Sequence, residues 1–305
     1  MNPRQPVYIV SKGRWQPERG LTTRYLHRMG VPHYIVVEGQ ERKDYEATAG
    51  PLATILTLDP EYQRTFDTCD PALDDRLGPG SGPPRNFAWD HAKADGFPWY
   101  WCMDDNIRGF YRLTRNRKYM VTDGTILRAM EDFVDRYENV AMAGPNYDFF
   151  APARQRLSPF EQNTRIYSCN LIRTDLPYRW RCRFNEDTDL SLRMLKDGWC
   201  TILFWAFLAK KAVTQSVSGG YAEIYREFGT IPKTEVLLKL HPDVTRMFWR
   251  YGRWHHYVDY TAFRRNKLRL KPGVVIPDEP NEYGMKLERR TGDEWRPADE
   301  PTYRV

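Results

Sequence analysis

The chain has 305 residues, 41% of them hydrophobic and 28% charged, which excludes a wholly disordered protein because a large apolar core can form. Its five cysteines are scattered without a C-x-x-C pair, which excludes a disulfide scaffold and argues against a structural zinc site. The net charge of +6 suggests a polyanionic partner. We therefore expect a reduced, intracellular protein.

Membrane association is not expected from the sequence. The longest apolar run, residues 199–209, is too short to cross a bilayer as a helix. The first ten residues lack the charged region and long apolar stretch of a signal peptide. A cytoplasmic location follows as the expectation.

Short apolar segments alternate with helical segments along the first sixty residues. Residues 7–10, 32–37 and 54–58 predict strands, and residues 21–29 and 41–47 predict the helices between them. This alternation is typical of a parallel sheet with helices on its faces, where ligands bind at the carboxyl ends of the strands. We therefore expect functional residues directly after the first two strands.

The middle of the chain continues the α/β pattern after a loop. Residues 67–84, rich in Asp, Pro and Gly, predict a surface loop, and residues 85–94 predict a helix behind two prolines. An apolar strand is predicted over 99–103. Later strands are predicted at 140–143, 166–172 and 200–208, and a helix at 190–195.

The C-terminal part changes character. Residues 232–240 and 244–251 predict two helices, and the Pro-rich, charged residues from 274 onward predict a loosely held tail. We therefore predict a catalytic core over residues 1–220, a helical, basic-aromatic extension over 221–272 and a tail over 273–305. No internal repeat is found.

Two carboxylates and an amide follow the strand at 99–103. Asp104 and Asn106 alternate with Asp105, so the first and last side chains share one side of an extended chain. Oxygen ligands of this kind suit Mg²⁺ or Mn²⁺ carrying a diphosphate. The alternative is an ordinary turn, because Asp and Asn favour turns after strands.

A second acidic group, Glu186-Asp187-Thr188-Asp189, stands just before the helix predicted at 190–195. One interpretation is helix capping, in which acids offset the helix dipole. The other is general base catalysis, in which a carboxylate near a cation-bound donor deprotonates an attacking hydroxyl. Together, the two acidic groups favour a metal-held nucleotide diphosphate leaving group and a carboxylate base.

Two nucleotide-binding motifs are missing from the sequence. There is no G-x-x-x-x-G-K-[ST] sequence, which argues against a P-loop NTPase. Ser11-Lys12-Gly13-Arg14 follows the first strand in place of G-x-G-x-x-G, which argues against a dinucleotide oxidoreductase.

These segments together resemble nucleotide-sugar glycosyltransferases of the GT-A fold. Within that class the chain most resembles the TET-associated glycosyltransferases of phages, which are thought to add sugars to 5-hydroxymethylated pyrimidines in DNA. The resemblance covers roughly residues 6 to 265. The segments that carry it are Ser11-Lys12-Gly13-Arg14, Tyr34 to Glu38 with Tyr45, Arg85-Asn86, Trp101 to Asn106, Asn185 to Arg193, and Ser218-Gly219-Gly220 with Tyr225.

The resemblance implies a GT-A-like, Rossmann-type mixed sheet and a role for each matching residue. It implies Asp187 as the base of an inverting reaction with Glu186 as the alternative, and Asp104 and Asn106 as ligands of Mn²⁺ or Mg²⁺. Asn106 stands where the family usually has Asp, and as a neutral ligand it would weaken metal affinity. The donor UDP-sugar would be contacted by Ser11, Lys12, Arg14, Glu38, Arg85, Asn86, Asp105, Gly219 and Gly220.

Two features of the expected donor site can be interpreted in more than one way. Gly219 and Gly220 allow a loop to close over the diphosphate, or form an ordinary turn. Many GT-A enzymes add a late His to the metal, and this chain has Thr214-Gln215-Ser216 there. His255 or His256 could serve instead, although such a pair on an aromatic segment is more often structural.

Basic residues gather in two stretches that suit a nucleic acid. The first directly follows the Asp-Asp-Asn group, and the second, residues 246–271, interleaves basic and aromatic side chains. Phosphate contact and base stacking need this combination, and a base inside a duplex would have to be flipped out. The alternative is a solvated basic face over a packed aromatic helix. The first stretch comprises Arg108, Arg112, Arg115, Arg117 and Lys118.

The expected function is transfer of a sugar from a UDP-sugar to a hydroxymethylpyrimidine in DNA. The resemblance also implies a phage-encoded enzyme that acts in the bacterial cytoplasm, without a membrane partner. Three alternatives remain at this point: a GT-A enzyme with a polysaccharide, lipid-linked or protein acceptor, a nucleotidyltransferase that releases pyrophosphate, and a catalytically idle DNA-binding module.

Overall fold

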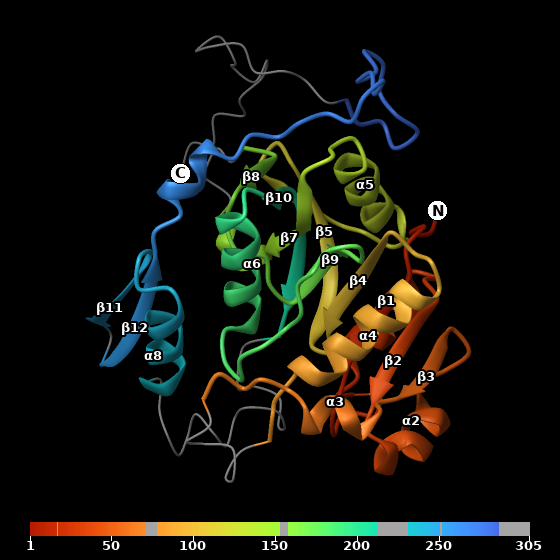
Figure 1. Ribbon diagram of the computed structural model, residues 1–305. Coiled ribbons are helices and arrows are strands. Elements are labelled where there is room, and N and C mark those ends of the chain that lie inside the picture. Colours follow the sequence, from red (N-terminus) through yellow and green to blue (C-terminus); the bar gives the residue numbers. More distant parts are fainter. Residues whose placement is uncertain (17, 71–77, 153–157, 213–230, 251, 287–305) are drawn as a thin grey trace.

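Four parallel strands form the N-terminal half of a ten-stranded mixed sheet (Figure 1). They are β1 (Val7–Val10), β2 (His33–Val37), β3 (Ala53–Thr57) and β4 (Trp99–Asp104), in the order β3-β2-β1-β4. β1 is buried along its whole length, as expected for a strand covered by helices on both faces. The computed structural model describes residues 1–16, 18–70, 78–152, 158–212, 231–250 and 252–286.

The other half of the sheet is mixed. β4 pairs antiparallel with β9 (Cys169–Arg173), which is followed in the sheet by β7 (Val140–Tyr147) and β10 (Cys200–Lys211). β7 and β10 are parallel to each other. The edge is a hairpin of β5 (Ile107–Thr114) and β6 (Arg117–Met120), and β8 (Phe160–Gln162) pairs with β10.

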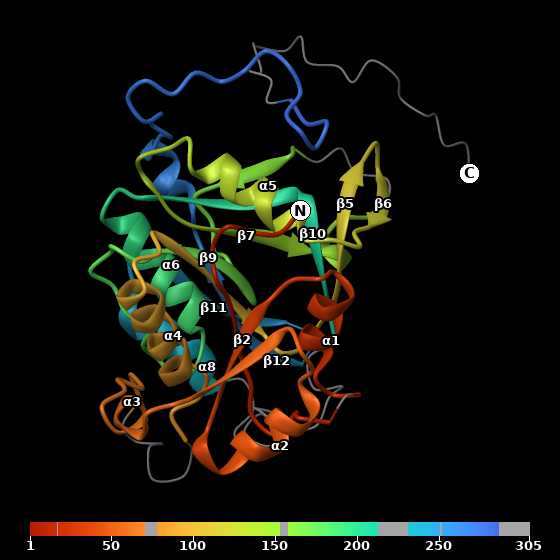
Figure 2. The ribbon, with the colours of Figure 1, turned by 90° about the vertical axis from the view of Figure 1, so that its right-hand side faces the viewer.

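Helices cover both faces of the sheet, as Figure 2 shows edge-on. One face packs against α1 (Leu21–Arg28), α2 (Arg42–Thr48) and α5 (Thr125–Val134). The other packs against α4 (Gly82–Ala94) and α6 (Glu186–Lys196), and α3 (Pro60–Arg64) lies against α4. Each face has its own core of fully buried side chains, which fixes the strands that carry the site.

A helix and a hairpin follow the sheet towards the C-terminus. They are α8 (Ile231–Leu240) and the antiparallel pair β11 (Thr245–Arg250) and β12 (Arg253–Val258), and they lie away from the main sheet in Figure 1. The prediction of a second helix over 244–251 is wrong. Aromatic and β-branched residues favour strands, and Gly252, with φ of +71°, allows the chain to turn back there.

The α/β fold with a large mixed sheet and flanking helices is confirmed. The helix predicted at 190–195 begins earlier, at Glu186, so the acids lie inside its first turn. The sequence analysis missed the β5–β6 hairpin and α5. The proposed boundary at residue 220 lies outside the described residues, so the domain division stays a prediction. Among the residues described, no helix has the length and apolar character needed to cross a membrane.

Candidate active site

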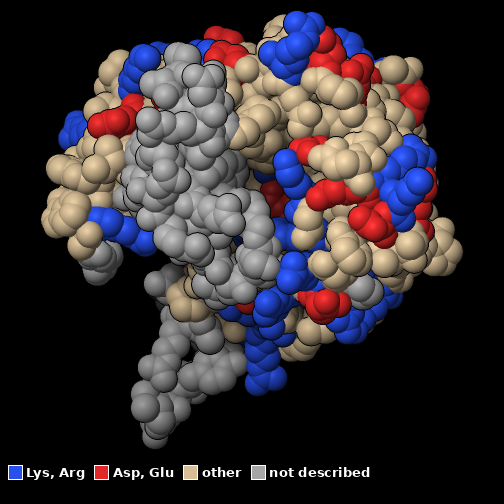
Figure 3. All heavy atoms as spheres, turned by 90° about the horizontal axis from the view of Figure 1, so that it is seen from below, with Lys and Arg blue, Asp and Glu red and all other residues tan. Residues whose placement is uncertain are grey.

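The carboxyl ends of β1, β2 and β4 meet at one edge of the sheet. Because these strands are parallel neighbours, the residues after them come together there: Ser11, Glu38 and Asp104. Seen from below in Figure 3, acidic and basic side chains lie next to one another on this face. The structure therefore brings these polar residues together at the strand ends, and their functional role stays a prediction.

The turn after β4 is held in place by α1. Thr22 Oγ1 donates a hydrogen bond to the backbone oxygen of Asp104 at 2.6 Å and accepts one from the backbone nitrogen of Ile107 at 2.9 Å. The backbone nitrogen of Thr22 also donates to the oxygen of Asp105 at 3.2 Å. The first turn of α1 thus fixes the chain that carries Asp104, Asp105 and Asn106.

Asp104 accepts hydrogen bonds from both sides of the site. Arg85 Nη2 lies 2.7 Å from Oδ1, and Ser168 Oγ and Lys211 Nζ lie 2.7 and 2.9 Å from Oδ2. Burial by itself would raise the pKa of this carboxyl, but the charges of Lys211 and Arg85 hold the pKa below its ordinary value. Asp104 is therefore a carboxylate near neutral pH.

Three residues near Asp104 were missed by the sequence analysis. Lys211 ends β10, Ser168 precedes β9 and Tyr147 ends β7, and the strand order brings them together. Lys211 Nζ donates to Ser168 Oγ at 2.7 Å and lies 5.5 Å from the Tyr147 ring centroid. Their spacing in the sequence carries no signal, because only the pairing of β4, β9, β7 and β10 makes them neighbours.

Arg85 connects the two acidic groups. Its Nη2 lies 2.7 Å from Asp104 Oδ1 and 3.5 Å from Glu186 Oε1, and its guanidinium lies 4.6 Å from the Trp180 ring centroid. The Arg85 side chain is 5% exposed, and Nε and Nη1 are buried without a hydrogen-bond partner among the described residues. A buried cation with unused donors can bind further anionic oxygens.

Asp105 faces away from Asp104, towards the loop after β1. Its carboxylate accepts a hydrogen bond from Ser11 Oγ at 2.7 Å and pairs with Arg14. Tyr45 OH lies 2.7 Å from Ser11 Oγ and accepts from the backbone nitrogen of Arg14 at 3.1 Å. Burial raises the pKa of Asp105, although Arg14 and Ser11 oppose the shift. The predicted donor residues Ser11, Arg14 and Asp105 therefore form one network.

Glu186 and Asp187 lie in the first turn of α6, where the helix dipole favours negative charge. Glu186 Oε1 accepts a hydrogen bond from Ser81 Oγ at 2.8 Å, and burial raises the pKa of Glu186 against the opposing effect of Arg85. Asp187 Oδ1 accepts from the backbone nitrogen of Thr188 at 2.7 Å. Of the two, only Glu186 has an ion pair among the described residues, so Asp187 is the freer carboxylate.

Asp189, the third acid of that group, has a structural role. Its buried carboxylate lies 2.9 Å from Arg181 Nη2, 2.8 Å from Arg193 Nε and 2.9 Å from His241 Nε2. These contacts tie α6 to the end of α8.

The three other predicted donor-binding residues that the structure describes, Lys12, Glu38 and Asn86, bond to protein groups near the site. Lys12 Nζ donates to Glu38 Oε1 at 2.7 Å, at the ends of β1 and β2. Burial alone would raise the pKa of Glu38, but the hydrogen bond from Lys12 lowers it. The Asn86 amide instead bonds the backbone of Trp180 twice, at 2.8 and 2.9 Å. That pairing holds the segment before α6, and a donor contact by Asn86 stays a prediction.

Asn106 provides an oxygen that fits a hard divalent cation. Its Oδ1 is buried and has no hydrogen-bond partner among the described residues. Among the described residues, Asp104 Oδ1 accepts one hydrogen bond, from Arg85, which leaves it a lone pair for a cation. One carboxylate and one amide oxygen, completed by substrate phosphates and water, match the ligands that Mg²⁺ accepts.

No third metal ligand is found in the part of the chain that the structure describes. That part contains no group of three His, Cys, Asp or Glu side chains able to hold a metal. His255 and His256 lie on β12, where burial lowers the pKa of His256 to about 4. Gly219 and Gly220 lie outside the described residues.

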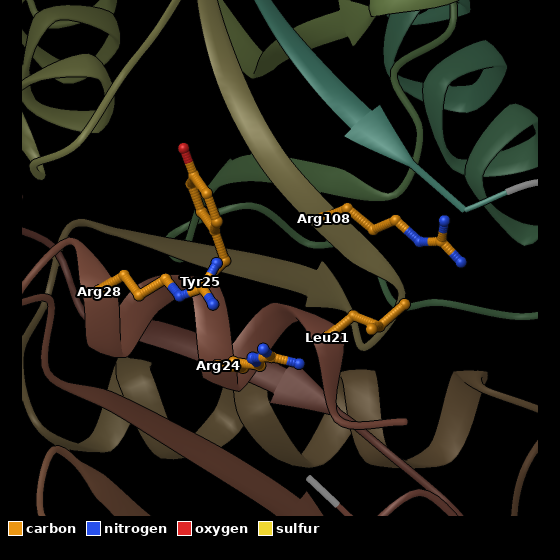
Figure 4. A pocket seen from close by; sticks show the side chains of 5 residues that line it. All are labelled: Leu21, Arg24, Tyr25, Arg28 and Arg108. Atoms are coloured by element: carbon orange, nitrogen blue, oxygen red, sulfur yellow. The ribbon is translucent and has the colours of Figure 1, made fainter. Parts of the chain in front are cut away.

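A surface pocket next to the Asp-Asp-Asn turn is lined by arginines. Figure 4 shows Arg24 and Arg28 coming from α1 and Arg108 from the start of β5. Leu21 and Tyr25 complete the lining of this cavity, which has a volume of about 200 Å³. Among the described residues that line it, none is acidic. Such a pocket suits an anionic group, since unbalanced guanidinium groups bind phosphate oxygens well.

The comparisons with known proteins identify the family. No curated protein matches this chain. Residues 5–220, which include Asp104, Arg85 and Asp187, match the family described as TET-Associated Glycosyltransferase. This match covers more than half of the chain and confirms the resemblance found in the sequence. The chain therefore belongs to the TET-Associated Glycosyltransferase family and is a glycosyltransferase.

Proposed function

We propose that this glycosyltransferase moves a sugar from a UDP-sugar to the hydroxyl of 5-hydroxymethylcytosine, or of another hydroxymethylpyrimidine, in DNA. The observation that carries the proposal is the position of Arg85 between Asp104 and Glu186. Arg85 thereby connects the carboxylate proposed to hold the metal-bound diphosphate to the acids proposed as the base. The family name supports the transferase chemistry.

The leaving group is proposed to bind at Asp104, Asn106, Arg85 and Lys211. A divalent cation held by Asp104 and Asn106 would neutralise charge on the diphosphate as the bond to the sugar breaks. Arg85 and Lys211 supply fixed positive charge at the same place, and Arg85 has unused donors. Preorganised charge of this kind is usually the largest contribution to catalysis.

The acceptor hydroxyl is proposed to lose its proton to Asp187. Asp187 is partly exposed, and Oδ1 takes the hydrogen bonds that Thr188 donates, at 2.7 and 3.3 Å. Its second oxygen can accept the hydroxyl proton while the acceptor oxygen attacks the anomeric carbon from the side opposite UDP. A single in-line displacement inverts that carbon. Glu186 is the alternative base, tied more tightly by Arg85 and Ser81.

DNA as acceptor is supported by the net positive charge of the chain and by the position of an arginine-lined pocket beside the candidate active site. The net charge is +6, and Arg24, Arg28 and Arg108 line a pocket beside the Asp-Asp-Asn turn whose described lining residues include no acid. A backbone phosphate of DNA would be held there while a base reaches the site. A neutral polysaccharide acceptor would have no anionic group for these arginines to bind.

Nucleoside analysis of modified DNA tests the proposal directly. DNA containing 5-hydroxymethylcytosine is incubated with the protein, Mn²⁺ or Mg²⁺ and a panel of UDP-sugars, and the digested nucleosides are weighed by mass spectrometry. A gain of one sugar on the modified nucleoside is expected. Asp187→Asn should lower the rate of sugar transfer by about a hundredfold or more. UDP binding, measured by calorimetry, should stay near that of the wild type.

Other outcomes separate the alternatives. Release of UDP without a gain on DNA would point to a different acceptor. Release of pyrophosphate would show a nucleotidyltransferase. Neither product from any donor would contradict the proposal and favour an idle module.

A further inference from the structure

Two exposed phenylalanines lie at the edge of the candidate active site. The short helix η3 (Asp148–Phe150) follows β7, and Phe149 and Phe150 are 60% and 43% exposed. Their ring centroids are 4.4 Å apart, and Phe149 stacks on Tyr147 at 5.1 Å with an interplanar angle of 27°. Adjacent large apolar side chains that remain exposed to water are a mark of binding surfaces.

Tyr147 connects these rings to the active site. Its hydroxyl lies 2.5 Å from Ser168 Oγ and 3.4 Å from Lys211 Nζ, and both of these groups contact Asp104. The Tyr147 ring also packs against Tyr167, with centroids 4.5 Å apart. A continuous row of aromatic rings therefore leads from the Asp104 carboxylate to the solvent at Phe149.

Positive charge flanks this row of rings. Lys118 of β6 reaches η3, where its Nζ donates to the backbone oxygen of Asp148 at 2.6 Å. Lys118 is exposed. Cations beside exposed aromatic faces are the combination that binds single-stranded nucleic acid.

We propose that Phe149 and Phe150 stack on bases of the acceptor DNA strand beside the modified nucleotide, while Lys118 contacts a phosphate of that strand. The inference rests on the proposed DNA acceptor and assigns it a surface on η3 and the β5–β6 hairpin. When a nucleotide is taken out of a duplex, the bases on either side of it lose a stacking partner, and the exposed rings replace that partner. The β11–β12 hairpin, with Trp249 60% exposed, is the competing surface.

Fluorescence of a DNA strand that carries 2-aminopurine next to 5-hydroxymethylcytosine tests this assignment. Stacking on Phe149 quenches the probe when the full-length protein and UDP are added. Phe149→Ala should remove the quenching and weaken binding about tenfold, from the typical value of base–aromatic stacking. Phe149→Trp should restore both, because an indole ring stacks as well. UDP binding by calorimetry should be the same in all three proteins.

Each remaining outcome counts against the proposal. Normal quenching in Phe149→Ala together with a loss in Trp249→Ala would place the strand on the β11–β12 hairpin. Equal weakening in Phe149→Ala and Phe149→Trp would indicate a structural role for Phe149. A wild-type protein that transfers sugar only to a saccharide or protein acceptor would refute the DNA acceptor itself, a failure distinct from an unchanged Phe149→Ala in a DNA-modifying enzyme.

Discussion

Lys211 Nζ lies 2.9 Å from Asp104 Oδ2, although the two residues belong to strands far apart in the sequence. Burial alone would lower the pKa of this lysine, but the Asp104 carboxylate raises it, so Lys211 keeps its positive charge. The pair places a permanent cation where the diphosphate of the donor is proposed to leave. This contact makes Lys211 part of the candidate catalytic machinery.

Replacing Lys211 by methionine should therefore slow sugar transfer. Methionine keeps the length of the side chain and removes the charge, so kcat/KM is expected to fall about a hundredfold, as when one preorganised donor is lost. Steady-state UDP release measures this. Lys43→Met, on the exposed face of α2, is the matched control and should behave as wild type. Equal rates in the two variants would remove Lys211 from the mechanism.

The metal site is tested most directly at Asn106. Asn106→Ala removes the buried amide oxygen and should weaken Mn²⁺ binding in the presence of UDP, by about tenfold or more. Asn106→Asp should instead tighten it, because a charged ligand raises cation affinity. Electron paramagnetic resonance of free Mn²⁺ gives both affinities. Identical Mn²⁺ affinity in wild type and both variants would exclude Asn106 as a ligand.

Removing the metal gives a second expectation for the same site. Excess EDTA should stop sugar transfer, and added Mn²⁺ or Mg²⁺ should restore it. Full activity in EDTA would show that Arg85 and Lys211 neutralise the diphosphate without a cation.

Asp189 makes folding stability depend on pH. Burial alone would raise the pKa of Asp189, but His241, Arg181 and Arg193 hold it below the ordinary value of 3.8. The folded protein therefore binds fewer protons at this site than the unfolded chain. The stabilisation is complete above the ordinary pKa and is lost as the pH falls towards the lower folded value.

Asp189→Asn should lower the free energy of unfolding at pH 7 by about 3 kcal/mol, because it removes the buried carboxylate that Arg181, Arg193 and the buried His241 all contact. It should also flatten the decline in stability below about pH 4. Urea unfolding at several pH values measures both effects. The control is Asp243→Asn, which breaks an exposed pair with Lys196 and should cost less than about 1 kcal/mol. A loss at Asp189 no larger than in this control would contradict the assignment.

Cys69 and Cys182 can be expected to form a disulfide when an oxidant is supplied. Both are free thiols, and their Sγ atoms lie 2.6 Å apart. The two segments are held together by a hydrogen bond from the Cys182 nitrogen to the Asp67 oxygen at 2.8 Å. The hydrogen bond to Cys69 and burial raise the pKa of the Cys182 thiol, so the partly exposed Cys69 is the first nucleophile.

Oxidised glutathione provides the test. The Cys69 thiolate attacks its disulfide and releases one glutathione, and Cys182 then displaces the second, so two hydrogens are lost from the protein. Peptide mapping without reductant should find the Cys69–Cys182 link in wild type and not in Cys69→Ser. A stable glutathione adduct without this link would show that the two thiols do not meet in solution.

The sequence by itself determined the framework of the sheet and the position of the acids. Runs such as Val7–Val10 and residues 99–103 are apolar on both faces, which only a strand covered on both sides can bury. A polar residue directly after such a strand must lie at the sheet edge. For this reason Ser11, Glu38 and Asp104 could be placed before any coordinates were known.

Local patterns were insufficient where two structures suit the same residues. The aromatic and basic residues of 245–258 are compatible with either a helix or strands. The chain turns at Gly252, and the antiparallel pairing across that turn makes them the strands β11 and β12. The β5–β6 hairpin was read only as a basic stretch, because its turn at Arg115 and Asn116 uses positive φ without a glycine. Secondary structure there is set by partners that are distant in the chain.

Only the tertiary structure decided which charges meet. Lys211, Ser168 and Arg85 surround Asp104 because β9, β10 and α4 converge on the end of β4. The same convergence brings Tyr147, and with it Phe149, next to the site. A buried charge is stable only beside its counter-charge, and which residue supplies that partner depends on strand order and not on spacing along the chain.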